Sequence, residues 1–207
     1  MARIITVLSL LNVCLAGMAA AGVTITFQKG LTYGSGQTYF GATDTWVMLG
    51  DNTNKSLDYQ LGIKADDSGQ IYEALLCFDG IFGTGADLIP PGSVITSATL
   101  TVVSNKSNGT RASVHRLLIN WPASCTFASL SDGIDQPNEY QTTPDDSNSS
   151  SVPNGMTVTY TVTGTVQAWS NNPTLNYGWV FRAVDLNPVG TSARPRLLRW
   201  PTGRSLK

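Results

Sequence analysis

The residue types that most often perform catalysis are scarce in this sequence. Its 207 residues include one histidine, His115, and two glutamates, Glu73 and Glu139. A serine hydrolase needs an imidazole beside a hydroxyl on an exposed turn, typically within a Gly-x-Ser-x-Gly segment, and no such segment occurs. Glycoside hydrolysis needs two carboxylates that face each other across a cleft, and no feature singles out such a pair. We therefore expect a protein that is not an enzyme.

Aromatic residues offer a different chemistry, because sugar-binding sites use exposed rings together with fixed polar groups. Four aromatics lie in turn-rich or polar stretches and are the candidate ligand-binding residues: Tyr33, Tyr39, Phe40 and Tyr140. The tryptophans on or beside apolar strands are expected in the core instead: Trp121, Trp169, Trp179 and Trp200. An acidic polysaccharide would also require cations, and those available are Lys55, Lys64, Arg111 and Arg116.

Aspartates at strand ends or in turns suggest one structural calcium ion, with Asp44 and Asp79 as the candidate ligands. Calcium takes oxygen ligands from carboxylates and backbone carbonyls. Aspartate also favours turns for purely local reasons, so turn formation is the alternative explanation of the same residues. No other cofactor is expected.

Two cysteines, Cys77 and Cys125, lie outside the first 21 residues. In an exported protein they would meet oxidising conditions, and one disulfide would then join them. Two separate buried thiols are the alternative, because the sequence does not show how far apart they lie.

The elements that must position these residues are short strands. Apolar and polar residues alternate with a period of two almost everywhere, and no window of eleven residues keeps a helical period. Strands are expected at 23–27, 45–49, 59–63, 71–78, 95–102, 112–121, 156–162, 178–182 and 195–200, with a polar surface loop at 136–154 and one helical turn at 166–169. Charged residues are only 13% of the chain, whereas glycine is frequent. We predict an all-β, antiparallel β-sandwich of jelly-roll type.

The first 21 residues have the pattern of a secretory signal peptide. Arg3 precedes an apolar run that is too short to span a bilayer easily, and Ala19–Ala21 provides small residues for cleavage. No later segment is long and apolar enough for a membrane helix, so we expect a secreted protein at the extracellular or cell-surface side. The net charge of −1 argues against a nucleic-acid partner.

Four blocks of the chain resemble the DNRLRE domain of secreted bacterial and archaeal proteins. They are Asp44–Val47, Leu75–Asp79 with Ile89–Leu100, Val114–Leu117 leading to Trp121, and Val166–Trp169 with Asn176–Phe181 and Arg194–Leu197. The resemblance covers about residues 22–200, with 1–21 as the signal peptide and 201–207 as a C-terminal tail. The chain differs in having Cys77 where the family commonly has arginine. The resemblance implies a β-sandwich that binds polysaccharide, often a uronic-acid polymer, or that builds extracellular structures.

Two functions are therefore predicted. The first is a secreted, non-catalytic module that binds polysaccharide, acidic polysaccharide included, in the extracellular or cell-wall space. The alternative is a structural subunit of an extracellular filament or matrix, assembled when a terminal strand joins a neighbour's sheet. In that alternative, Val23–Phe27 is the strand and the glycine-rich segment 30–41 is its hinge.

Overall fold

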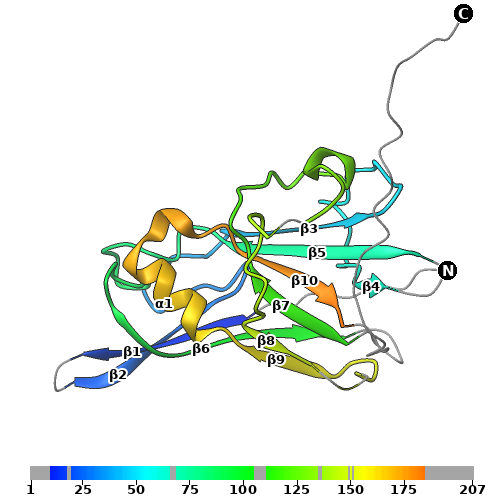
Figure 1. Ribbon diagram of the computed structural model, residues 1–207. Coiled ribbons are helices and arrows are strands. Elements are labelled where there is room, and N and C mark those ends of the chain that lie inside the picture. The colour runs from blue at the N-terminus through cyan, green and yellow to red at the C-terminus, as the bar shows by residue number, and fades with distance from the viewer. Residues whose placement is uncertain are drawn as a thin grey trace, which may run out of the picture.

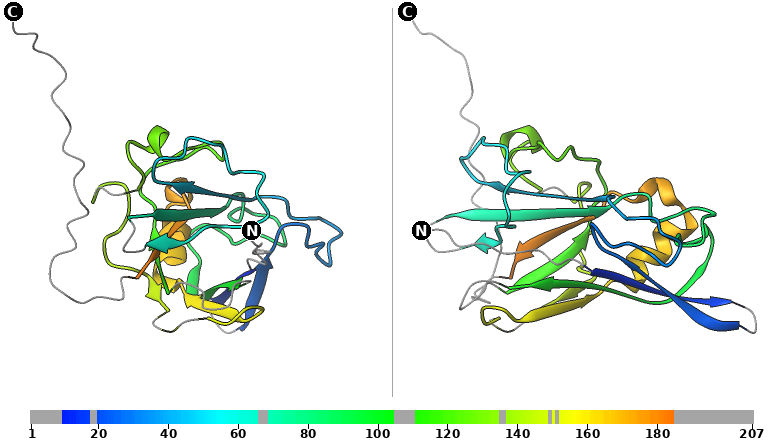
Figure 2. Two further views of the ribbon diagram at one scale, coloured as in Figure 1. Left: turned by 90° about the vertical axis from the view of Figure 1, so that its right-hand side faces the viewer. Right: turned by 180° about the vertical axis from the view of Figure 1, so that it is seen from behind.

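The chain folds into two antiparallel sheets stacked face to face (Figures 1 and 2). A computed structural model describes residues 10–17, 20–65, 69–104, 111–134, 137–148, 150 and 152–184. The four-stranded sheet has the order β2 (Ala20–Phe27), β1 (Leu10–Gly17), β6 (Val94–Val103) and β9 (Thr157–Thr161). The six-stranded sheet has the order β3 (Ala42–Met48), β5 (Ile71–Phe78), β10 (Trp179–Ala183), β7 (Ala112–Arg116) and β8 (Asp146–Ser147), and β4 (Lys64–Ala65) pairs with β5. The predicted all-β, antiparallel sandwich is confirmed, whereas its jelly-roll type stays a prediction.

The main core fills the space between the two sheets. The four-stranded sheet contributes apolar side chains that include Phe27 and Leu100, and the six-stranded sheet contributes Leu76, Phe78 and Trp179, all with no exposed surface. This alternation of apolar and polar residues is the sequence signal that predicts a half-buried strand. Burial of this apolar surface is the main force that holds the two sheets together.

Strand β5 is buried on both faces. Leu76 and Phe78 point into the main core, whereas Leu75 and Cys77 belong to a second cluster on the opposite face of the six-stranded sheet. The cover of this second core comes from the segment between β7 and β8, which includes the short helix η1 (Ala128–Leu130): Leu117, Trp121, Cys125, Phe127, Leu130 and Ile134. The six-stranded sheet is therefore the middle layer of the molecule.

Helix α1 (Thr163–Asn171) closes one end of the sandwich (Figure 1). The Gln167 amide oxygen accepts a hydrogen bond from the Ile95 N–H, at 2.8 Å, and the Gln167 amide nitrogen donates to the Ser93 carbonyl. Trp169 packs on Trp179, with ring centroids 4.5 Å apart. The predicted helical turn at 166–169 is thus part of a longer helix, which the short helix η2 (Pro173–Leu175) follows.

Part of the predicted signal peptide, residues 1–21, belongs to the fold in this structure. In the full chain, Leu10–Gly17 forms β1, between β2 and β6, and the side chains of Leu11 and Val13 have no exposed surface. A signal peptide and a buried strand both need a short apolar run, so composition alone does not distinguish them. Removal of residues 1–21 stays a prediction.

Other sequence-based expectations have mixed outcomes. Residues 59–63 are not a strand, and β7 stops at Arg116 rather than residue 121. Trp121, Trp169 and Trp179 are buried as predicted. The predicted strand at 195–200, with Trp200, and the tail at 201–207 lie outside the described residues. In the part of the chain that the structure describes, no helix is long and apolar enough to cross a membrane.

Gly178 lies where a side chain would collide with the sheet, so the Gly178→Ala variant should be strongly destabilised. Its φ is +77°, and an added Cβ would overlap the Leu76 carbonyl oxygen and Cys77. Left-handed strain of about 1–2 kcal/mol and overpacking of about 1–3 kcal/mol should together lower the free energy of unfolding by about 3 kcal/mol. Gly36→Ala is the matched control, because Gly36 has a φ of +85° but no atom near an added Cβ. If urea denaturation gave the same loss of unfolding free energy for Gly178→Ala and Gly36→Ala, the close contact of residue 178 with Leu76 and Cys77 would not be important.

Candidate functional site

The end of the six-stranded sheet that lies opposite helix α1 (Figure 1) carries three cationic residues. Strand β5 begins here, where Tyr72 pairs with Lys64 of β4. Strand β10 ends here at Ala183, which pairs with the first residue of β7, and Arg111 directly precedes that residue. Lys55 lies at the same end, because its side chain contacts Trp46 near the C-terminal end of β3. We call this region, defined by Lys55, Lys64 and Arg111, the basic end.

Lys55 lies over the indole ring of Trp46, with its ammonium nitrogen 5.1 Å from the ring centroid. The indole itself is held in place from two sides. Its Nε1–H donates a hydrogen bond of 3.0 Å to the Asp58 carboxylate, and Gly62 packs so closely on the ring that an added Cβ would overlap it. A cation over an aromatic face is stabilised by the ring quadrupole. The contacts with Asp58 and Gly62 therefore hold the Trp46 ring where its face meets the Lys55 ammonium group.

Asp51 fixes the position of Lys55 from the other side. The two side chains form an ion pair of 2.9 Å. Hydrogen bonds from the Thr53 side chain, then from Lys55, lower the pKa of Asp51 to about 2, so this carboxylate is ionised at neutral pH. Surface ion pairs are weak, so an incoming carboxylate can compete for the lysine.

Lys64 has the same arrangement on the neighbouring ring. Its ammonium nitrogen lies 5.6 Å from the ring centroid of Tyr72 and donates to the Gln70 amide oxygen at 2.5 Å. The Tyr72 hydroxyl donates to the same oxygen at 3.2 Å. The rings of Trp46 and Tyr72 are 5.3 Å apart, so two lysines are held by adjoining rings.

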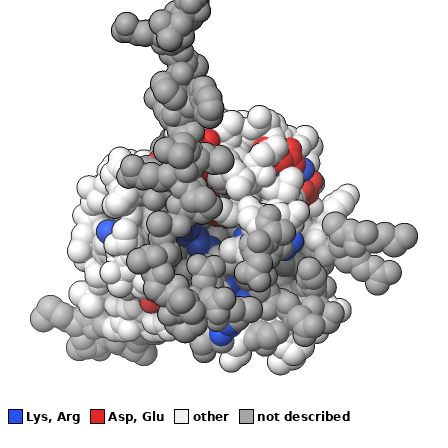
Figure 3. Space-filling model, turned by 45° about the vertical axis from the view of Figure 1, so that its right-hand side comes forward, with Lys and Arg blue, Asp and Glu red and all other residues white. Residues whose placement is uncertain are grey.

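Exposed apolar groups lie beside these lysines. Tyr59 is 80% exposed and Leu57 is 91% exposed, and they flank Asp58, which binds Trp46. Figure 3 shows Lys and Arg side chains at several separate places on this face, with a group of Asp and Glu side chains to one side. The basic end thus combines fixed cations with an exposed ring, which suits a ligand that has both carboxylates and an apolar face.

The predicted ligand-binding aromatics are not brought together as one exposed surface. Tyr39 is a core residue, 7% exposed, and its hydroxyl donates to the Asp79 carbonyl. Tyr33 packs edge-on against Phe27. The expectation that Tyr39 lies outside the core is wrong, and Tyr33 is partly buried against the core, because a turn-rich sequence sets the backbone path and not the burial of each side chain.

The other two predicted aromatics differ in exposure and contacts. Phe40 is 70% exposed. Tyr140 packs on His115, with ring centroids 5.3 Å apart, and the Arg182 guanidinium lies 4.6 Å from its ring. Phe40 is therefore the predicted residue with the most accessible ring.

Asp44 and Asp79, the predicted calcium ligands, have other surroundings. Burial raises the pKa of Asp44, and nearby Lys29 opposes this effect. Asp79 accepts hydrogen bonds from the hydroxyl of Thr43 and the thiol of Cys77. Among the described residues, no group of three or more His, Cys, Asp or Glu side chains is placed to hold a metal ion. The calcium site stays a prediction without a ligand set.

Both cysteines are free and buried thiols in the structure. Burial raises the pKa of Cys77, and burial likewise raises the pKa of Cys125 to about 11. The Cys77 thiol is 3.4 Å from an Asp79 carboxylate oxygen and 3.7 Å from the Asn176 amide oxygen. The structure thus shows the alternative of two separate thiols rather than the bridge.

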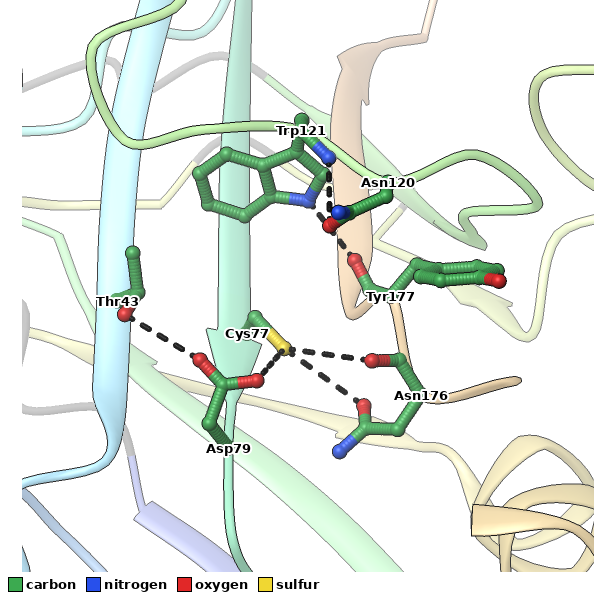
Figure 4. Close-up of a pocket in the computed structure, with 7 residues that line it drawn as sticks. All are labelled: Thr43, Cys77, Asp79, Asn120, Trp121, Asn176 and Tyr177. Atoms are coloured by element: carbon green, nitrogen blue, oxygen red, sulfur yellow. Dashed lines mark hydrogen bonds between the residues drawn. The ribbon is translucent and has the colours of Figure 1, made fainter. Parts of the chain in front are cut away.

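Cys77 also lines a small hollow between the ends of β3 and β5 and two loops (Figure 4). The hollow has a volume of about 40 Å³ and is lined by Thr43, Cys77, Asp79, Asn120, Trp121, Asn176 and Tyr177. Ligand pockets usually measure about 300–1,000 Å³. The polar groups in this hollow already bond one another, so we do not assign it a ligand.

His115 is hydrogen-bonded through both ring nitrogens. Nδ1 lies 2.9 Å from the Gln141 carbonyl, which only accepts, so Nδ1 is the protonated nitrogen of the neutral ring. Nε2 then accepts from the Ser113 hydroxyl at 2.8 Å. Burial lowers the pKa of His115, and the ring is 7% exposed. This Ser–His pair is enclosed beneath Tyr140.

Glu73 is a buried carboxylate on the same face of the sheet. It forms an ion pair of 3.0 Å with Arg182 and accepts a hydrogen bond of 2.9 Å from the Ile134 N–H. Its side chain is 2% exposed. Glu73 therefore ties the segment that covers the second core to the sheet beneath it.

The residues that the sequence analysis missed are Trp46, Tyr59 and Tyr72. Trp46 and Tyr72 lie on apolar strands, which is typical of core residues. Period-two alternation gives the face of each strand, but it does not give the register that brings these rings together. Lys55 and Lys64 were recognisable only as available cations.

A scan against protein-family models finds no match for this chain, and a search of curated proteins finds no relative. The resemblance to the DNRLRE domain stays a prediction that rests on the residues quoted for it.

The Arg182→Met variant should lose stability, because it removes the ion pair that Arg182 forms with the buried Glu73 carboxylate. Breaking one side of a buried pair costs about 3–5 kcal/mol. The double variant Arg182→Met/Glu73→Gln should recover part of this loss, since a neutral amide costs less to bury. The free energies of unfolding from chemical denaturation of the single and double variants test this. A double variant less stable than Arg182→Met would contradict the assignment.

Proposed function

We propose that the protein is a secreted, non-catalytic module that binds acidic polysaccharide in the extracellular or cell-wall space. The observation that favours this function is the pair of lysines held over adjoining aromatic rings at the basic end. A uronic-acid polymer presents carboxylates at a regular spacing along a chain of sugar rings. Lys55 and Lys64 would pair with carboxylates, and the exposed ring of Tyr59 would pack on a sugar face.

Preorganisation supports this proposal. A lysine side chain has several rotatable bonds, and ordering it costs about 0.5–1.5 kcal/mol on binding. Here the ammonium groups of Lys55 and Lys64 already lie over the rings of Trp46 and Tyr72, which an incoming carboxylate does not displace. Because Asp51 and Asp58 lie beside Lys55, the proposal depends on the positions of the two lysines over the rings and not on an excess of positive charge. The proposed binding involves no cofactor.

Native gel electrophoresis with polygalacturonate or alginate in the gel tests the proposal. The wild-type protein should be retarded by either polyuronate and not by neutral dextran. Retardation should weaken as NaCl rises from 0.1 M to 1 M, because the screening length falls from about 10 Å to about 3 Å. A protein that neither polyuronate retards would contradict the proposed function.

The site is tested by the double variant Lys55→Gln/Lys64→Gln. Each lost ion pair removes up to about 1 kcal/mol, so the double variant should bind more weakly by up to about thirtyfold. Phe40→Ala is the matched control, because Phe40 is an exposed aromatic and the described residues place no cation over its ring. Loss of binding in Phe40→Ala, with binding intact in the lysine variant, would place the site elsewhere.

A further inference from the structure

Strand β1 lies inside the four-stranded sheet and not at its edge. It is antiparallel to β2 on one side and to β6 on the other. Val13 pairs with Ile25 of β2 and with Ala98 of β6, and both Leu11 and Val13 are fully buried in the main core. Without β1, the facing backbone groups of β6 would be unpaired and the main core would have an apolar gap at the positions of Leu11 and Val13. We call the place that β1 occupies the β1 seat.

The predicted cleavage point lies one strand further along the chain, within β2. Cleavage after Ala21 would remove all of β1 and leave Gly22–Phe27 as the first residues of the protein. The β6 edge would then lose its partner, and the core would lose Leu11 and Val13. Unpaired backbone groups and the cavity left by Leu11 and Val13 would each lower the free energy of unfolding. Another strand in the β1 seat would restore this stability.

The same chain cannot refill the seat in the original geometry. Because β2 and β6 are both antiparallel to β1, they run parallel to each other. If β2 moved beside β6, it would form a parallel pair, which is less stable for each residue. A strand from a second copy can enter in the direction of β1.

The N-terminal residues of the cleaved chain match the seat. Val23-Thr24-Ile25-Thr26-Phe27 alternates apolar and polar residues, as does Leu11-Asn12-Val13. Entering in the direction of β1, Val23 and Ile25 would take the places of Leu11 and Val13. No charged residue occurs in β1, β2 or β6 to oppose such pairing.

The β1–β2 hairpin extends beyond the rest of the sandwich (Figures 1 and 2). After cleavage, the remaining strand would thus start at the periphery of the molecule. Its outer end would be within reach of another copy without disturbing the six-stranded sheet.

We propose that the chain cleaved after Ala21 assembles head to tail, with Val23–Phe27 of each copy filling the β1 seat of the next. Each copy gives one strand and receives one, so the contact is heterologous. Such contacts form a ring when the rotation closes and a filament when it does not. The partner is a second copy of this chain.

The test uses the full chain, exported by a secreting host. Intact mass gives the N-terminus of the product, and sedimentation velocity gives its size. The proposal predicts a product that begins near Gly22 and sediments at multiples of the monomer mass. A product that keeps residues 10–17, or a cleaved product that is monomeric, would overturn it.

Two further measurements identify the strand and the seat. Ile25→Asp should shift the exported product to the monomer mass, because it places a charge in the apolar seat. Thr24→Asp should remain assembled, because that exposed side chain points away from the core. An excess of a synthetic peptide of residues 10–17, in reducing buffer, should dissociate the wild-type assembly, and the peptide with Leu11→Asp/Val13→Asp should not.

Assembly that persists in Ile25→Asp, or that both peptides leave intact, would overturn the proposed contact. Polyuronate retardation of the Ile25→Asp monomer reports on the basic end separately, since Ile25 belongs to the opposite sheet. The two proposals can therefore fail independently.

Discussion

The six-stranded sheet can be the middle layer of this protein because the buried ion pair of Glu73 and Arg182 helps to anchor the segment that covers its outer face. A sheet with apolar side chains on both faces must be covered twice, and β5 shows this need because every residue from Glu73 to Phe78 is buried. The four-stranded sheet covers one face. The irregular segment after β7 covers the other, and an irregular segment needs polar anchors for its backbone groups. Glu73 supplies one by accepting the Ile134 N–H.

The same carboxylate also neutralises the charge of Arg182. Glu73 compensates Arg182, which lies on Tyr140, and Tyr140 in turn covers His115. These groups are used by the fold. Lys55 and Lys64 contact aromatic rings instead, nearer the end of the sheet, and their positions depend on the register of β3, β4 and β5. The structural charges and the proposed binding charges are thus separate sets on one sheet.

Much of the fold could be predicted from the sequence because alternation is a local property. Alternation within 71–78 predicts Leu76 and Phe78 on one face of the strand and Leu75 and Cys77 on the other, and the structure has them so. The burial of Tyr39 could not be predicted, since it depends on contact with Phe27 and Phe78, which are distant in sequence. The site at the basic end was missed for the same reason. It depends on strand register and on the loop that brings Lys55 to Trp46.

The N-terminal segment shows that one pattern can have two physical uses. A short apolar run with a preceding positive charge suits export, and the same run with alternating buried positions suits a strand. The two uses succeed each other if the segment directs export and is then removed. In that case the β1 seat links export to assembly, while the basic end lies on the other sheet.

The most direct test of the binding proposal is an NMR titration of the protein with a defined oligogalacturonate. Amide shifts in ¹⁵N-labelled protein report which backbone positions lie near the ligand. The account predicts that shift changes concentrate at Lys55, Tyr59, Lys64 and Tyr72, with residues of helix α1 unchanged. Changes centred on helix α1 or on Phe40, or no changes at saturating ligand, would contradict it.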